Sequence, residues 1–147
     1  MSPLVVVGST VVKSAILWRR YSLIRHSSSL VSYTVENDDN DNKVGILTLN
    51  SPKTYNALTM DMGRAFKALI TEVEHDLQSS SNVQAIVLQG AGDQAFSAGG
   101  NLEWLQSLSH NSVHANMDLM LQFYNSFLGM RQRLPVPVIA ALQGPAM

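Results

Sequence analysis

The sequence predicts an α/β fold, and three observations support that prediction. Short apolar or β-branched runs, typical of strands, occupy residues 31–35, 43–50, 85–90 and 137–142. Between these runs, apolar residues recur every three or four positions, which is the spacing of one face of a helix. Two of the runs lead into glycine-containing loops, at residues 90–100 and 143–147. In α/β folds, functional sites form where strands end in such loops.

The first half of the chain predicts a hairpin followed by a helix. VSYTV at 31–35 and KVGILTLN at 43–50 flank the polar turn NDDNDN, so the two strands should pair. Pro52 then breaks the strand pattern. Thr59 is the expected N-cap of the helix, and Asp61 lies in the first turn, where the helix dipole favours an acid. The residues expected to face the core are Leu58, Met62, Phe66, Leu69, Ile70, Val73 and Leu77.

The second half alternates strands and helices again. AIVLQG at 85–90 is a continuous apolar run, as expected for a strand covered on both faces. The loop AGDQAFSAGG leads into a short helix at Asn101, and a longer helix is predicted from Ser112 to Arg133, ended by two prolines. PVIAAL at 137–142 is another buried strand. The residues expected to face inward on the longer helix are Met117, Met120, Leu121, Tyr124, Phe127 and Leu128.

Composition excludes several classes of function. The 147 residues are 46% hydrophobic with a formal net charge of -1, which suits one domain or part of a larger one. The nearly balanced charge gives no sign of a nucleic-acid partner. The absence of cysteine excludes disulfides, thiolate metal sites and cysteine nucleophiles. His110 and His114 can share a helical face, but no third ligand is spaced to join them, so no metal site is predicted.

The first 30 residues have the composition of a mitochondrial presequence. The segment before Glu36 contains no acidic residue, but it contains four basic residues and a serine run at 27–29. RRYS at 19–22 resembles a matrix-protease cleavage context, so we expect residues 1–30 to be cleaved or disordered and the protein to act in the matrix. A secretory signal would place its charges before the apolar run, and here they follow it. Lys13 interrupts that run, which argues against a membrane span.

The loop QAFSAGGNL, at residues 94–102, exposes backbone N–H groups ahead of a helix that Asn101 can cap. Such amides stabilise negative charge, on either a bound phosphate or an oxyanion that develops during a reaction. The phosphate-loop patterns GxxxxGK[ST] and GxGxxG do not occur: the segment at 90–95 has alanine at the sixth position. A turn in which the glycines only allow positive φ remains the other interpretation.

Three segments, in order, resemble the crotonase superfamily, the enoyl-CoA hydratase/isomerase group. GILTLNSPKTYNALT at 45–59 is similar to the family's opening strand and turn. AIVLQGAGDQAFSAGGNL at 85–102 is similar to its signature segment with the first oxyanion donor, and PVPVIAALQGPAM at 135–147 is similar to the start of its second catalytic loop. The resemblance covers residues 33–147 and implies a crotonase-like (ClpP/crotonase) α/β fold, built of ββα units. Residues 31–147 would be its N-terminal part.

The resemblance implies roles for particular residues. The N–H of Gly100 would be the catalytic group here, as the first oxyanion-hole donor to the thioester oxygen of an acyl-CoA. The expected substrate-binding residues are Lys53, Tyr55 and Ala57 near the adenine and phosphates of CoA, and Ala98, Gly99, Gly100, Asn101 and Leu102 beside the thioester. Lys53 is read equally well as a solvated surface lysine. No separate cofactor is implied, because CoA is part of the substrate.

Two departures from the family qualify the resemblance. Asn101 stands where aspartate is common; both cap helices, but a chemical role of that aspartate would be lost. The second oxyanion donor and the catalytic acids are implied to follow residue 147, so we expect the core to be truncated about halfway. An unfinished sheet would leave PVIAAL as an apolar edge. The acidic residues that are present, expected to be solvated charges, are Glu72, Glu74, Asp76, Asp93 and Glu103.

The implied reaction is hydration of a 2-enoyl-CoA through a stabilised enolate, in fatty-acid or branched-chain amino-acid breakdown. The alternatives are a 3-hydroxyacyl-CoA hydrolase, an isomerase or a decarboxylase of the same superfamily. The resemblance implies a homotrimer or hexamer at full length. The charge balance and Lys13 argue against a nucleic-acid partner and stable membrane insertion. Two further hypotheses remain: a non-catalytic form that binds CoA thioesters or pairs with full-length subunits, and a chain that does not fold stably alone.

Overall fold

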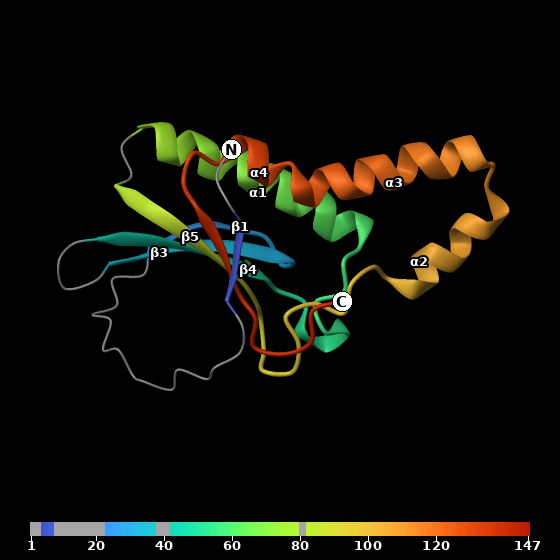
Figure 1. The fold of residues 1–147 in the computed structure, drawn as a ribbon, viewed down its shortest axis with the longest axis horizontal. Coiled ribbons are helices and arrows are strands. Elements are labelled where there is room, and N and C mark those ends of the chain that lie inside the picture. The colour runs from blue at the N-terminus through green and yellow to red at the C-terminus, as the bar shows by residue number, and fades with distance from the viewer. Residues whose placement is uncertain (1–3, 8–22, 38–41, 80–81) are drawn as a thin grey trace.

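A computed structural model describes residues 4–7, 23–37, 42–79 and 82–147 (Figure 1). Six strands in this part of the chain form one sheet in the order β1-β6-β5-β4-β3-β2. The strands are β1 Leu4–Val7, β2 Leu23–Ser27, β3 Val31–Asn37, β4 Lys43–Leu49, β5 Val83–Gly90 and β6 Val138–Ala141. The helices are η1 Pro52–Thr54, α1 Met60–Ser79, α2 Leu102–Ser107, η2 Leu108–His110, α3 Val113–Leu128 and α4 Met130–Arg133.

The predicted hairpin and the α/β alternation are confirmed. β3 and β4 pair antiparallel, with Val31 opposite Leu49 and Asn37 opposite Lys43. β4, β5 and β6 run parallel to one another, and α1 crosses over between β4 and β5. Residues 38–41, within the predicted turn NDDNDN, lie outside the described residues. The carboxyl ends of the parallel strands therefore meet at one edge, where both glycine-containing loops begin.

The core lies between one face of the sheet and α1. Pairing brings Tyr33, Leu47, Leu88 and Ala140 into one row across β3, β4, β5 and β6, and all four are buried. The α1 residues that pack against this face include Met62, Phe66, Leu69, Ile70 and Val73, as the spacing predicted. Thr59 also caps α1 as expected, since its hydroxyl accepts the Met62 N–H at 3.1 Å.

The other face of the sheet differs from the sequence prediction. Ile46, Val87 and Ile139 form a row on that face and are only half-buried, so β5 is not covered on both faces. Among the described residues, α1 lies over the face that contains Tyr33 and Leu47, which explains why the opposite face is less enclosed.

The prediction that β6 forms an apolar edge is wrong. β6 pairs with β5 on one side and with β1 on the other, both parallel, with Val5 opposite Ile139. The strand next to it comes from residues 1–30, the predicted presequence. Cleavage of that segment stays a prediction, since the RRYS context at 19–22 lies outside the described residues.

The longer predicted helix is divided, and only part of its predicted inward face is confirmed: Met120 and Phe127 are half-buried, whereas the other four residues are exposed. α3 ends at Leu128, Gly129 forms a turn, and α4 then ends at Arg133. Phe123 is buried and Phe127 is half-buried, whereas the side chains of Val113, Met117, Leu121, Tyr124 and Leu128 are all more than half exposed. Figure 1 shows the reason: α2 and most of α3 project beyond the sheet, so they have little core to face.

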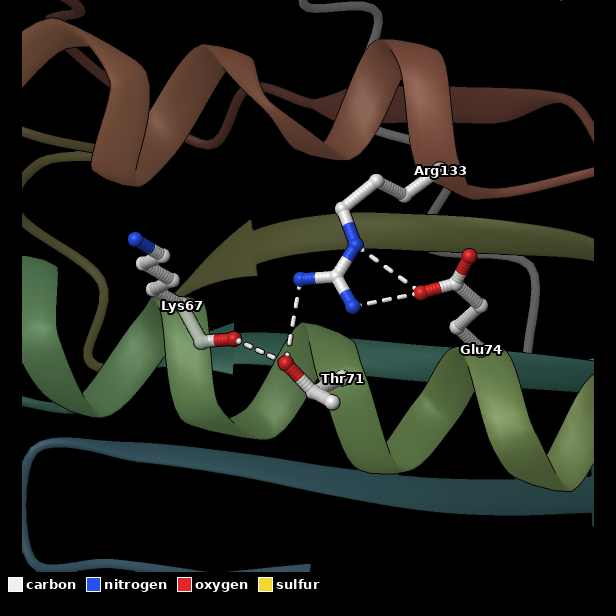
Figure 2. A network of polar contacts seen from close by, with 4 residues as sticks. All are labelled: Lys67, Thr71, Glu74 and Arg133. Carbon is white, nitrogen blue, oxygen red and sulfur yellow. Dashed lines mark hydrogen bonds and ion pairs between the residues drawn. The ribbon is translucent and has the colours of Figure 1, made fainter.

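Aromatic rings and one ion pair hold this projecting unit to the body. The Phe127 ring lies 5.5 Å from that of Phe66 on α1, and Phe123 stacks at 4.8 Å on Trp104 of α2. Farther along, Arg133 donates from Nε and Nη2 to Glu74, and from Nη1 to the Thr71 hydroxyl (Figure 2). The Phe127–Phe66 contact and the Arg133 contacts fix α4 and the end of α3 against α1, whereas the Phe123–Trp104 contact joins α3 to α2.

Candidate active site at the glycine loop

Three segments far apart in the sequence meet at the carboxyl ends of the parallel strands. The turn at 51–58 follows β4, the loop at 91–101 follows β5, and residues 142–147 follow β6. An isolated parallel bridge joins Leu58 to Gly100, and another joins Ser97 to Ala146. The loop predicted to hold the oxyanion donor therefore lies between the other two segments, and each of them donates or accepts backbone hydrogen bonds along it.

Hydrogen bonding distinguishes Gly100 from its neighbours in this loop. The N–H groups of Phe96 and Ser97 both donate to the Pro145 carbonyl, and that of Ala98 donates to Tyr55 at 2.8 Å. The Gly99 N–H donates to the Ser97 hydroxyl at 3.1 Å, and the Asn101 N–H to the Leu58 carbonyl at 3.0 Å. Among the residues that the structure describes, no acceptor is bonded to the Gly100 N–H.

The direction of that free N–H is set by its own peptide group. The Gly99 carbonyl, which belongs to the same planar peptide, accepts the Leu58 N–H at 2.7 Å. In a trans peptide the N–H points opposite to the C=O, so the Gly100 N–H points away from Leu58. A preorganised backbone donor with no internal acceptor is the group that an oxyanion site requires.

The helix after the loop begins as predicted. The Asn101 side chain accepts the Trp104 N–H at 2.8 Å, which makes it the N-cap of α2. Leu102 is 73% exposed at the first position of α2, and Leu105, one turn later, lies against Gly100. Apolar side chains thus flank the free N–H on the helix side. Glu103, also in the first turn, is exposed.

A pocket of about 280 Å³ opens between the turn after β4 and the loop after β5. Lys53 and Tyr55 line it, together with Asp93 and Gln94 from the other side. Of the three residues predicted to lie near the nucleotide end of CoA, the structure therefore brings Lys53 and Tyr55 into one pocket. Ala57 is not among the residues that line it.

Sequence reasoning missed the polar side chains that hold these segments together. Asn56 is fully buried and adopts positive φ, as do few residues other than glycine. The Gln143 amide donates to the carbonyls of Gly90 and Ala95, at 2.6 and 3.2 Å. The one local signal for Asn56 was its place in a turn after proline, because asparagine tolerates left-handed backbone better than most residues.

The remaining candidate groups lie apart from this site. Glu74 on α1 accepts hydrogen bonds from Arg133 of α4. Glu72 and Asp76 lie on α1 as well, away from the glycine loop. His110 and His114 are both exposed. Within the described ranges, no three histidine or acidic side chains gather as metal ligands do. No described helix is both long and apolar enough to span a bilayer.

Comparison with known proteins identifies the family and the fold. The profile of the enoyl-CoA hydratase/isomerase family matches residues 44–147, and the chain belongs to that family. The solved structure of an enoyl-CoA hydratase/carnithine racemase from Magnetospirillum magneticum superposes with a TM-score of 0.63 and 28% identity, covering 81% of this chain and 40% of that one. The α/β fold is therefore the crotonase fold, present in part.

Curated relatives are similar over the same region. YngF of Bacillus subtilis is 32% identical over 117 residues, covering 80% of this chain and 40% of YngF. The short-chain-enoyl-CoA hydratase of Clostridium acetobutylicum is 32% identical over 109 residues, covering 74% and 39%. The mitochondrial 3-hydroxyisobutyryl-CoA hydrolase of Bos taurus is 31% identical over 105 residues, covering 70% and 25%. The chain spans two fifths or less of these relatives.

Proposed function

We propose that this chain supplies the first half of an acyl-CoA site, in which the Gly100 N–H donates to the thioester oxygen. The observation that carries the proposal is the unpaired Gly100 N–H, because the N–H groups of residues 96–99 and 101 on either side of it are all bonded. Abstraction of a proton next to a thioester, or addition to its conjugated double bond, moves negative charge onto that oxygen. A fixed donor stabilises this charge more in the transition state than in the substrate.

The pocket of Lys53 and Tyr55 would receive the nucleotide end of CoA. Lys53 is exposed at its rim, where an ammonium group attracts the phosphates. Tyr55 is 52% exposed and offers an aromatic face on which a purine can stack. Asp93 on the opposite wall carries a like charge to the phosphates, so it would lie beside the base rather than the phosphates. Ala98, Gly99, Asn101 and Leu102 would surround the thioester.

The proposed reaction is hydration of a 2-enoyl-CoA. The Clostridium acetobutylicum relative is named as such a hydratase, while the bovine relative is named a 3-hydroxyisobutyryl-CoA hydrolase, which keeps hydrolysis as the alternative. Isomerisation and decarboxylation remain further alternatives of the same superfamily. Each needs acid–base groups in addition to the Gly100 donor.

Mitochondrial location and assembly into trimers or hexamers belong to the same proposal. The acid-free, basic composition of residues 1–35 supports import, and several relatives are named as mitochondrial. Incubation of the labelled chain with isolated mitochondria tests this directly. Protection from added protease with shortening near residue 30 is expected, and an unshortened, protease-sensitive chain would contradict it.

Calorimetric titration with crotonyl-CoA and with free CoA tests the site itself. Gly100→Pro removes the one N–H, whereas Gly100→Ala keeps it and places a methyl 3.3 Å from the flexible end of Leu105. One lost hydrogen bond corresponds to roughly a threefold to tenfold weaker affinity. We expect Gly100→Pro to weaken crotonyl-CoA by that factor and free CoA by less than twofold, with Gly100→Ala resembling the parent. Absence of crotonyl-CoA binding by the folded parent would refute the proposal.

A further inference from the structure

Ser97 lies at the centre of the glycine loop and is only 4% exposed. Its hydroxyl donates to the Asn56 carbonyl at 2.9 Å and accepts the Gly99 N–H at 3.1 Å. A hydroxyl has one proton to donate, so this side chain uses its donor and one acceptor position inside the protein. Ser97 therefore acts as a connector between two backbone segments and is not directed toward a ligand.

Asn56, the residue to which Ser97 donates, connects the walls of the pocket. It is 0% exposed, and its Oδ1 accepts the Ser51 N–H at 2.9 Å. Its Nδ2 donates to the carbonyls of Ala91 and Ala95, at 3.0 and 3.1 Å. Ala91 and Ala95, from the loop after β5, line the pocket together with Lys53 and Tyr55 from the turn after β4. One buried amide thus joins the turn after β4 to the loop after β5.

The two side chains form one continuous series of hydrogen bonds. It runs from Ala91 and Ala95 through the Asn56 side chain, then from the Asn56 carbonyl through Ser97 to Gly99. The peptide after Gly99 contains the free Gly100 N–H. We propose that Asn56 and Ser97 are positioning residues that hold the pocket in fixed register with this N–H. The role toward a ligand rests on the proposed function; the role in orienting the backbone does not.

Glycine explains why such a restraint is needed. Gly99 has φ of 78° and is followed by a second glycine, so this dipeptide has more conformational freedom than any other in the loop. The Gly99 N–H bond to Ser97 and the Leu58 N–H bond to the Gly99 carbonyl restrain the two peptide planes before Gly100. Loss of the Ser97 hydroxyl would release the first plane and leave the Gly99 N–H and the Asn56 carbonyl without this partner.

The test compares Ser97→Ala with Ser97→Thr, which keeps the hydroxyl, and with Ser109→Ala as the matched control. The Ser109 hydroxyl donates to the Gln106 carbonyl at 2.8 Å, but on an exposed turn outside the site. NMR on the ligand-free 147-residue chain measures amide exchange at Gly99 and residual dipolar couplings of the Gly100 N–H. Ser97→Ala should speed exchange at Gly99 about tenfold and change the Gly100 coupling. Ser97→Thr and Ser109→Ala should leave both near the parent values.

Ligand binding provides a second readout that a purely structural role would not move. The ratio of the crotonyl-CoA affinity to the free CoA affinity should fall about threefold to tenfold in Ser97→Ala, with free CoA changed less than twofold. Should Ser97→Ala not fold, Ser97→Cys fills similar space with a weaker hydrogen-bonding group and is expected to shift both readouts in the same direction.

Two outcomes separate this inference from the proposed function. Parent-like exchange at Gly99 and an unchanged Gly100 coupling in a folded Ser97→Ala chain would overturn the positioning role, whatever the ligand data show. If the parent binds neither CoA nor crotonyl-CoA, the proposed function fails, and the NMR comparison still decides whether Ser97 orients the donor.

Discussion

Gly90, the last residue of β5, is the position at which a single methyl group should disturb the site most. A Cβ there would lie 2.3 Å from the Phe96 carbonyl oxygen, 2.7 Å from Asn56 Nδ2 and 2.9 Å from the Ala95 carbonyl oxygen. Real Cβ contacts of that kind do not occur, so something must move. Two of the three atoms are backbone, and the third is a buried amide with both donors engaged.

The expected cost of Gly90→Ala follows from these contacts. Inserting a carbon into a packed interior costs typically about 1–3 kcal/mol. Displacing Asn56 Nδ2 also strains two hydrogen bonds, each with a net contribution of about 1 kcal/mol. We expect the free energy of unfolding to fall by about 3 kcal/mol, a large fraction of the stability of an ordinary domain.

Urea unfolding followed by far-ultraviolet circular dichroism measures this effect. Gly100→Ala is the matched control, because the nearest atom to its added methyl is the mobile end of Leu105 at 3.3 Å. That variant should lose less than about 1 kcal/mol. We argue that glycine is required at the end of β5 because other backbone atoms approach it closely, and not because the loop must be flexible. Equal unfolding midpoints for the two variants would refute that argument.

Three further predictions concern the surrounding elements. A double-mutant cycle of Arg133→Gln and Glu74→Gln should give a coupling energy of about 0.5–1 kcal/mol in unfolding experiments, since both side chains are partly exposed. Zero coupling would contradict a stabilising ion pair between them. Leu121→Gln should change the free energy of unfolding by less than about 0.5 kcal/mol, because Leu121 is 61% exposed, whereas Phe123→Ala should lower it by about 3 kcal/mol. Equal costs for the two variants would contradict the assignment of Phe123 to the buried face of α3. In thermal melts, Asn101→Asp should match the parent melting temperature, whereas Asn101→Ala should lose about 1 kcal/mol with the capping hydrogen bond. An alanine variant as stable as the parent would contradict a stabilising cap.

Local signals in the sequence were sufficient for most of the elements. The spacing from Met62 to Val73 identified the buried face of α1, because that helix lies directly over the sheet and meets one continuous core. Thr59 and Asn101 were recognised as caps because capping depends on the N–H groups of the next turn alone. The glycine loop was also found, since small residues between a strand and a helix leave backbone groups accessible.

The errors arose where burial depends on what lies opposite. Met117, Leu121 and Tyr124 show helical spacing, but α3 extends past the sheet, so apolar spacing alone could not tell a core face from an exposed one. The neighbour of β6 was missed because β1 is more than 130 residues away in sequence, and no local pattern reports such a pairing. In both cases the local pattern was read correctly, and the missing information was which distant segment lies opposite.

The candidate site also combines a local signal with a long-range partner. The resemblance to the crotonase superfamily indicated Gly100, and the bridge explains why its N–H is free: Leu58 pairs with Gly100 through the carbonyl of Gly99 and the N–H of Asn101. In a parallel bridge, the residue in the middle directs its own N–H to the other side. The donor is thus a consequence of how Leu58 lies along the loop, and Ser97 and Asn56 matter because they hold the loop in that register. A change that shifted the loop by one residue would leave a different N–H unpaired and would move the proposed oxyanion position with it.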